Sequence, residues 1–406
     1  MTERTSQDVL SMLKRKTDRQ GNLKEPLTTI ENFLIVLRND PFFSNVRFNL
    51  MRSHPEISID GKTQLWTETD DSIMFNHIET EYGFKNETNN QHAFKIFCAE
   101  REYNPVLERI EAIQWDGQKR CESFLVKYMG ADDTPYNREC SRMLFACGTH
   151  RYVNPGCKVD FVPVFMGDQG GGKTTVCQWL ALEPKFYTSA KTISGKAGIE
   201  SIDGKWIVEL EELLAVLAND RAGQKVEEAA KAFLTTQSDF YRKPYGHRPQ
   251  DYPRYCIFIG TTNRDTFLTD KTGNRRWYPI RCNPSADYLY AHKEEVQAEI
   301  EQCWAEMLAA YRANAPISRA TPNAHLLQEI KAEQREAEVE DYRAGLIEEY
   351  IRDKKRVCIL DLWRNCLHDR SVTVPDMQRR DSVEIGEILT NQLKWERGKS
   401  VKNYYR

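Results

Sequence analysis

A glycine-rich segment contains the residues whose types and spacing point most directly to chemistry. Gly167–Thr174 fits the pattern G-x-x-x-x-G-K-[ST] and lies between an apolar run and a helical pattern over Thr175–Leu182. Such glycines let the backbone wrap around a phosphate, Lys173 reaches the terminal phosphates, and the Thr174 hydroxyl binds Mg²⁺. The segment predicts a site for ATP and Mg²⁺, and the strand–turn–helix context disfavours a chance glycine-rich turn. The predicted nucleotide-binding residues are Gly167, Asp168, Gln169, Gly170, Gly171, Gly172, Lys173, Thr174 and Thr175.

Carboxylates follow a second apolar run, Trp206–Val208. Hydrolysis requires a carboxylate for Mg²⁺ and a residue that orients the attacking water. Glu209, directly after the run, is predicted to share Mg²⁺ with Thr174, and Glu212 is predicted to polarise the water. The alternative is that these glutamates only open the next helix, where acidic residues suit the helix dipole.

A third apolar run, Tyr255–Ile259, leads to Asn263. An amide can donate and accept at once, so Asn263 is predicted to hold the attacking water. A local turn made by a strand-end asparagine is the alternative.

Two adjacent arginines, Arg275 and Arg276, precede the apolar run Trp277–Ile280. Guanidinium groups beside an apolar strand need an anionic partner, because an unpaired buried charge is costly. That partner is either an acid of the same chain or an anion supplied from outside it.

Basic residues gather around a Tyr-Gly turn within Tyr241–Arg254. A hairpin here would present positive charge and aromatic rings, which together bind single-stranded nucleic acid. A solvated basic loop is the alternative, and the basic tail 394–406 is a second possible DNA contact. The predicted nucleic-acid residues are Arg242, Lys243, His247 and Arg248.

The apolar runs and the helical patterns between them predict the architecture of the chain. Continuous apolar strands separated by helical patterns predict an α/β core with a parallel sheet. The stretch before the core reads as mainly helical, and the end of the chain could form a small winged-helix-like domain. We expect a mobile or weakly helical leader over 1–22, a helical N-terminal domain over 23–130, the phosphate-binding core over 131–285, a helical connector over 286–340 and the winged-helix-like domain over 341–406.

Net charge, apolar runs and cysteine spacing argue against several classes of protein. The chain has 406 residues and a formal net charge of −3, so any nucleic-acid surface must be local. We find no apolar run long enough for a bilayer and no apolar segment of a secretory signal at the N-terminus. The 11 cysteines include no Cys-x-x-Cys pair, which argues against a zinc ribbon and fits a reducing cytoplasm.

The order of these motifs resembles the virulence-associated E family, which comprises phage- and prophage-encoded ATPases related to superfamily 3 helicases of the AAA+ class. The resemblance rests on Gly167–Thr174, Trp206–Leu213, DFYRKPYG at 239–246, FIGTTN at 258–263 and TGNRRWYPI at 272–280. It implies a P-loop ATPase core in a homo-oligomeric ring, expected to be a hexamer, in the cytoplasm of a bacterial host. It also implies that Arg275 or Arg276 reaches the γ-phosphate bound to the neighbouring subunit.

The resemblance leaves three functions open. The leading one is an ATP-driven helicase or translocase that acts on single-stranded or forked DNA during replication of a phage or mobile element, with a separate primase as a possible partner. The second is a nucleotide-switched initiator or loader that binds DNA and recruits a primase without unwinding. The third is a ring ATPase with a protein target in phage defence.

Overall fold

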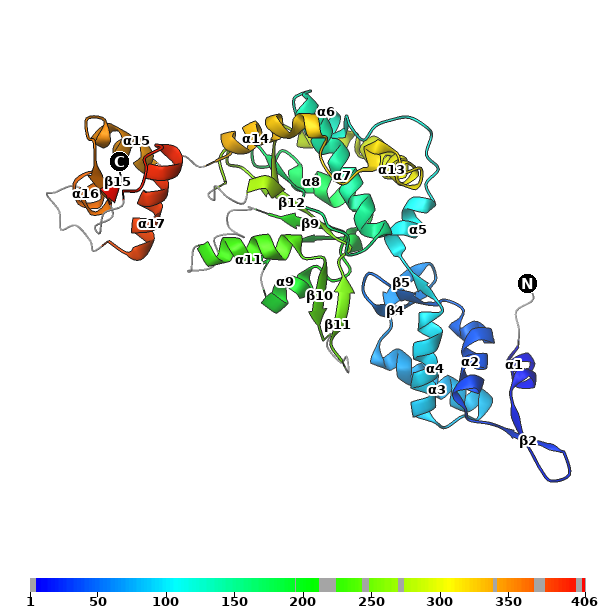
Figure 1. Cartoon of the computed structure of the whole chain (residues 1–406). Coiled ribbons are helices and arrows are strands. Elements are labelled where there is room, and N and C mark those ends of the chain that lie inside the picture. Colours follow the sequence, from blue (N-terminus) through cyan, green and yellow to red (C-terminus); the bar gives the residue numbers. More distant parts are fainter. Residues whose placement is uncertain are drawn as a thin grey trace. The chain divides into compact units, whose positions relative to one another are not determined.

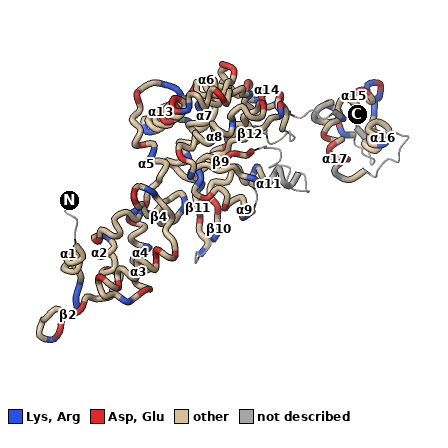
Figure 2. The backbone as a smooth tube through the Cα atoms, turned by 180° about the vertical axis from the view of Figure 1, so that it is seen from behind, with Lys and Arg blue, Asp and Glu red and all other residues tan. Residues whose placement is uncertain are grey.

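The computed structural model describes residues 5–193, 195–211, 224–242, 248–268, 274–338, 342–368, 377–398 and 404–405. Glu212, Lys243 and His247 therefore lie outside the described residues. The chain divides into two compact units, Met1–Ala337 and Glu338–Arg406 (Figure 1). Lys and Arg are interspersed with Asp and Glu along the described chain, in keeping with the small net charge (Figure 2).

A parallel five-stranded sheet forms the centre of the first unit, in the order β13-β7-β12-β9-β8. The apolar runs that precede Gly167, Glu209 and Asn263, and the run Trp277–Ile280, correspond to four of its strands. The prediction of an α/β core is confirmed. β7, β9 and β12 are buried along their whole length, as expected for strands covered on both faces. The strands are β7 (Val162–Met166), β8 (Tyr187–Ser189), β9 (Ile207–Leu210), β12 (Ile257–Thr262) and β13 (Trp277–Arg281).

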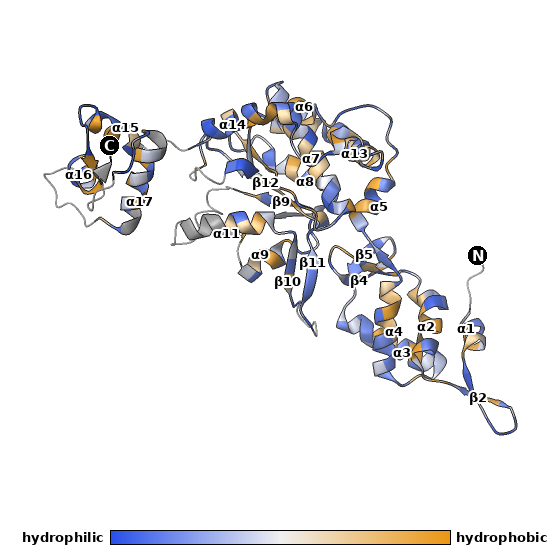
Figure 3. Cartoon of the chain, viewed as in Figure 1, coloured by the Kyte–Doolittle hydropathy of each residue, from blue (hydrophilic) through white to orange (hydrophobic). Residues whose placement is uncertain are grey.

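Helices cover both faces of this sheet with separate apolar clusters. Phe145, Val176 and Trp304 belong to the cluster on one face, and Phe233 and Phe258 belong to the other. Figure 3 shows the apolar residues concentrated on the sheet and on the adjoining sides of its helices. Removing this apolar surface from water is the main source of stability. The helices of this region are α5 (Pro105–Glu111), α6 (Phe124–Met129), α7 (Pro135–Val153), α8 (Lys173–Leu180), α9 (Gly195–Ser201), α11 (Gln224–Thr235), α12 (Ala286–Ala291), α13 (Lys293–Arg312) and α14 (Leu327–Glu336).

The N-terminal region combines helices with a four-stranded sheet, in the order β5-β4-β3-β6. The sequence patterns predicted the helices and missed this sheet, because its strands are short and partly exposed. The helices are α1 (Ser6–Met12), α2 (Ile30–Asn39), α3 (Glu68–Tyr82) and α4 (Glu87–Ala99). The strands are β1 (Arg15–Thr17), β2 (Leu23–Pro26), β3 (Val46–Asn49), β4 (His54–Ile59), β5 (Lys62–Leu65) and β6 (Glu102–Tyr103).

Within the segment expected to be a mobile or weakly helical leader, the described helix α1 is packed. Thr5 caps α1 through a reciprocal capping box with Asp8. Val9 and Leu13 are buried in the same apolar cluster as Phe33 of α2. The two apolar side chains are too few to form a recognisable stripe in the sequence, and tertiary contacts fix the helix.

The second unit is built from helices and one short pair of strands. Its core contains Ile347, Leu362, Ile385 and Leu389. β14 and β15 pair antiparallel. The winged-helix assignment stays a prediction. The elements are α15 (Tyr342–Ile351), β14 (Val357–Cys358), α16 (Ile359–Asn365), α17 (Arg379–Glu387), a π-helical turn (Ile388–Gln392) and β15 (Tyr404–Tyr405).

In the described part of the chain, every helix is too short or too polar to cross a membrane.

Candidate functional site

The predicted phosphate loop joins the end of β7 to the start of α8. Gly170 and Gly172 have φ angles of +83° and +103°, which favour glycine over other residues. A Cβ atom on Gly172 would lie 2.6 Å from Cδ1 of Leu289, and one on Gly167 would lie 2.1 Å from the carbonyl oxygen of Cys282. Both the backbone conformation and the close packing therefore require glycines in this loop.

Lys173, the first residue of α8, turns back against the loop. Its Nζ donates hydrogen bonds to the backbone carbonyl oxygens of Gly167, at 2.7 Å, and Asp168, at 2.6 Å. Burial lowers the pKa of the ammonium group below its usual value. The lysine charge is thus held within the loop, where an anionic ligand would be favourable.

Glu209 lies completely buried on β9 beside this loop. Its Oε1 accepts hydrogen bonds from the hydroxyls of Thr174 and Thr261, each at 2.8 Å, and its Oε2 accepts one from Tyr187 at 2.5 Å. Burial and the bond to Glu209 raise the pKa of Tyr187, so this hydroxyl stays protonated. The two residues predicted to share Mg²⁺, Thr174 and Glu209, are therefore in direct contact.

A pocket of about 270 Å³ opens at the carboxyl ends of β7, β9 and β12. It brings together much of the predicted loop and Asn263, which follows β12 as expected. Residues from α12 form another part of its wall. The lining residues are Gln169, Gly170, Gly172, Lys173, Thr174, Thr175, Glu211, Thr261, Thr262, Asn263, Ala286 and Tyr290.

Glu211 is a pocket residue that the sequence interpretation missed. It is exposed, lines the pocket, and accepts a hydrogen bond from the Ser189 hydroxyl at 3.0 Å. Side chains alternate along a strand, so Glu209 and Glu211 share a side while the buried Leu210 points to the other. Extending that alternation one residue beyond β9 would have selected Glu211, whereas Glu212 lies outside the described residues.

Arg275 and Arg276 lie at the amino end of β13, whereas the phosphate loop lies at the carboxyl end of the neighbouring strand β7. β13 runs parallel to β7, with Trp277 beside Val162 and Arg281 beside Met166. Arg275 and Arg276 precede Trp277, whereas the phosphate loop follows Met166. The amino and carboxyl ends of these paired strands are four residues apart, which is roughly 13 Å at the usual rise per residue of a strand. Arg275 is exposed and Arg276 is half-buried.

The buried Nε of Arg276 has no hydrogen-bond partner within the described residues. The structure therefore does not bring either arginine to the phosphate loop of its own chain.

The predicted hairpin is present as β10 (Ser238–Tyr241) and β11 (Gln250–Pro253), which pair antiparallel. Arg242 and Arg248 are exposed next to its tip. Phe240 is 67% exposed on the stem.

The base of the hairpin is anchored in the core. Arg254 donates hydrogen bonds to both carboxylate oxygens of the buried Asp239, at 2.6 and 2.7 Å, and also donates to the carbonyl oxygen of Phe233 in α11. The hairpin is thus anchored at its base. Of the basic tail 394–406, residues 399–403 and 406 lie outside the described residues.

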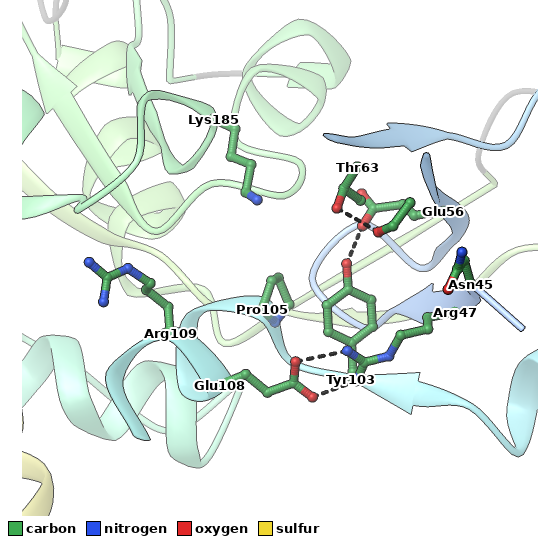
Figure 4. Close-up of a pocket in the computed structure, with 10 residues that line it drawn as sticks. Asn45, Arg47, Glu56, Thr63, Tyr103, Pro105, Glu108, Arg109 and Lys185 are labelled. Atoms are coloured by element: carbon green, nitrogen blue, oxygen red, sulfur yellow. Dashed lines mark hydrogen bonds and ion pairs between the residues drawn. The ribbon is translucent and has the colours of Figure 1, made fainter. Parts of the chain in front are cut away.

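A second pocket, of about 320 Å³, lies beside the N-terminal sheet (Figure 4). Many of its polar groups are satisfied by one another: Arg47 pairs with Glu108 and stacks 3.8 Å from the ring centre of Tyr103, whose hydroxyl donates to Glu56. Unlike the first pocket, this one has no glycine-rich loop and does not lie at the carboxyl ends of parallel strands. We assign it no function.

The side chains of Thr174 and Glu209 are of the kinds that hold Mg²⁺ in phosphate-binding sites. Within the described ranges, no three or more His, Cys, Asp or Glu gather to hold a metal ion. Mg²⁺ in phosphate sites is usually held by one or two protein groups together with phosphates and water. Thr174 and Glu209 fit that requirement. All eleven cysteines are free thiols.

The fold and the pocket define an α/β protein with a glycine-rich loop at the carboxyl edge of a parallel sheet. A family model for the virulence-associated protein E-like domain matches residues 110–340, so the chain belongs to this family and that prediction is confirmed. No curated protein matches the chain.

Among solved structures, the apo structure of NrS-1 C terminal region (305-718) is 15% identical, with a TM-score of 0.46 over 85% of this chain and 83% of that chain. The A form apo structure of NrS-1 C terminal region-CTR is 13% identical, with a TM-score of 0.45 over 89% and 95% of the two chains.

Proposed function

We propose that this chain is an ATP-hydrolysing, ring-forming helicase or translocase that acts on DNA during replication of a phage or mobile element. The observation that carries the proposal is the hydrogen bond from Thr174, which lines the pocket together with the glycine loop, to the buried carboxylate of Glu209. Membership of the virulence-associated protein E-like family agrees with it.

The proposal gives tasks to the phosphate loop and to the residues around Glu209. The loop amides and Lys173 bind the phosphates of ATP, and Thr174 with Glu209 would hold Mg²⁺. Bound Mg²⁺ neutralises charge on the phosphates during transfer. Tyr187 and Thr261 orient the Glu209 carboxylate by donating hydrogen bonds to it. These two donors hold the buried carboxylate in one orientation beside the loop.

The attacking water is handled by Asn263 and Glu211. Both side chains are exposed in the pocket and follow neighbouring strands, β12 and β9. Glu211 can accept a proton from the water, while the amide of Asn263 can donate and accept to orient it. Glu211 thereby takes the role first expected of Glu212.

The position of Arg275 and Arg276 supports assembly of the chain into a ring. Arg275 and Arg276 precede the amino end of β13, away from the phosphate loop of the same chain. An arginine that stabilises the γ-phosphate in the transition state would then come from a neighbouring subunit, as a planar and permanently charged donor. A homohexamer is the assembly we expect.

The composition of the hairpin favours DNA over protein as the polymer that the chain binds. Arg242 and Arg248 are exposed next to the tip of an anchored hairpin whose stem exposes Phe240. Positive charge binds the phosphate backbone and aromatic rings stack on bases, without sequence preference. We expect Lys243 and His247 to add to the same tip.

DNA-stimulated ATP turnover tests the proposal. Single-stranded DNA should increase the rate of phosphate release by the wild-type chain, and a forked duplex should be unwound in the presence of ATP and Mg²⁺. Stimulation without unwinding would favour the initiator or loader, with a primase as its partner. ATP turnover that is indifferent to DNA would favour a protein target and would refute the helicase proposal.

A further inference from the structure

The segment after β13 packs closely on the phosphate loop. A Cβ atom on Gly171 would lie 2.9 Å from the carbonyl oxygen of Pro284, and one on Gly172 would lie 2.6 Å from Cδ1 of Leu289. Leu289 of α12 is fully buried. Two neighbouring glycines of the loop thus pack against the segment from Pro284 to Leu289, and α12 is held next to the start of α8.

This packing positions Tyr290 beside the pocket. Ala286 and Tyr290 are one helical turn apart on α12, on the same face, and both line the pocket. The Tyr290 hydroxyl lies 3.4 Å from Oγ1 of Thr175, and its ring meets that of Trp179 edge-to-face, with centroids 6.1 Å apart. Two contacts from α8 therefore orient the ring.

Most of the ring remains accessible nonetheless. Tyr290 is 63% exposed, although it is a large aromatic residue fixed by its neighbours. An exposed aromatic face next to a phosphate loop offers a stacking surface for a planar base, and every nucleobase has a suitable face. Ala286 leaves space beside it because its side chain is a single methyl group.

We infer that Tyr290, with Ala286, forms the subsite for the base of the bound nucleoside triphosphate. The inference rests on the proposed nucleotide site and adds to it the part of the ligand that the phosphate loop does not recognise. The subsite contributes affinity for base-bearing triphosphates over bare triphosphate. Stacking is tolerant of base identity, so this residue gives little selection among the bases.

The test compares two ligands on the same variants by isothermal titration calorimetry. A non-hydrolysable ATP analogue carries base and phosphates, whereas inorganic tripolyphosphate carries phosphates alone; both are titrated with Mg²⁺ present. Tyr290→Ala should weaken binding of the ATP analogue by roughly 5- to 150-fold, the range that follows from the loss of one aromatic–base stack. Its affinity for tripolyphosphate should stay at the wild-type value, and Tyr290→Phe should restore binding of the analogue.

Tyr288→Ala is the matched control. Tyr288 lies on the same short helix and is 41% exposed, but its ring stacks on His292 and does not line the pocket. This variant should bind both ligands as the wild type does. Equal losses of both ligands in Tyr290→Ala, or no loss of either, would overturn the inference. A wild-type chain that binds neither ligand would instead refute the proposed nucleotide site itself.

Discussion

Replacing Glu211 by glutamine separates the chemistry of the pocket from its stability. Glu211 is exposed, and its described contact is the hydrogen bond accepted from Ser189 at 3.0 Å. A glutamine side chain has nearly the same shape and keeps a carbonyl oxygen that can accept this bond. The substitution removes the charge and the ability to take a proton, and it removes little else.

The expected sizes of the two effects differ widely. An exposed substitution of this kind changes the free energy of unfolding by about 0.5 kcal/mol or less. Losing a general base slows a reaction by roughly 10²- to 10⁴-fold, which equals about 3–5 kcal/mol in the activation free energy. Glu211→Gln should therefore unfold at nearly the wild-type temperature and bind ATP normally, while its turnover falls by at least two orders of magnitude.

Phosphate release at saturating ATP, measured beside thermal unfolding, checks this expectation. Glu212→Gln is the comparison variant, since it places the same change one residue further along the chain. If Glu212→Gln loses turnover and Glu211→Gln does not, the assignment by strand alternation is wrong and the earlier expectation for Glu212 holds. If neither variant loses turnover, the water is activated by another group.

Three further results are expected. Arg275→Ala and Arg276→Ala should each bind ATP, and the variant that lacks the acting arginine should fail to hydrolyse it. Mixing that variant with Lys173→Ala should restore part of the activity if the arginine acts between subunits, and no recovery in demonstrably mixed rings would exclude that. Replacing Arg242 and Arg248 together by alanine should weaken DNA binding. The slope of log affinity against log salt concentration should become shallower by up to about two, because fewer counterions are released. An unchanged slope would favour the alternative of a solvated basic loop. Burial raises the pKa of several tyrosines, so the stability they contribute is complete below pH 10 and is lost as the pH rises toward 12; urea unfolding midpoints should fall over that range, and constant midpoints would contradict it. The tyrosines whose pKa burial raises to about 12 are Tyr128 and Tyr255.

The sequence predicted the parts of the site that depend on local chain chemistry. The pattern from Gly167 to Thr174 can be recognised from the chain itself, because its glycines allow a backbone conformation that other residues rarely adopt. The apolar runs before Glu209 and Asn263 are likewise enough to identify buried strands. Parallel strands then bring their carboxyl ends together, which is why Thr174 and Glu209 are found in contact.

The features that the sequence did not predict depend on tertiary packing. Tyr290 reaches the pocket because α12 packs on the glycines of the loop, and nothing near it in the sequence indicates this. The helix containing Val9 and the short strands of the N-terminal sheet are fixed by contacts with distant residues. Glu211 could have been found from strand alternation, but its run of acidic neighbours also fits the start of a helix.

The direct test of the central claim is ATP hydrolysis by Lys173→Ala. Lys173 donates its described hydrogen bonds to the loop backbone, at 2.6 and 2.7 Å, and the variant removes its charge. The wild-type chain should release phosphate from ATP in the presence of Mg²⁺, and the variant should unfold as the wild type does but release none above background. Undiminished phosphate release by a folded Lys173→Ala chain would contradict the assignment of this pocket as the site of ATP hydrolysis.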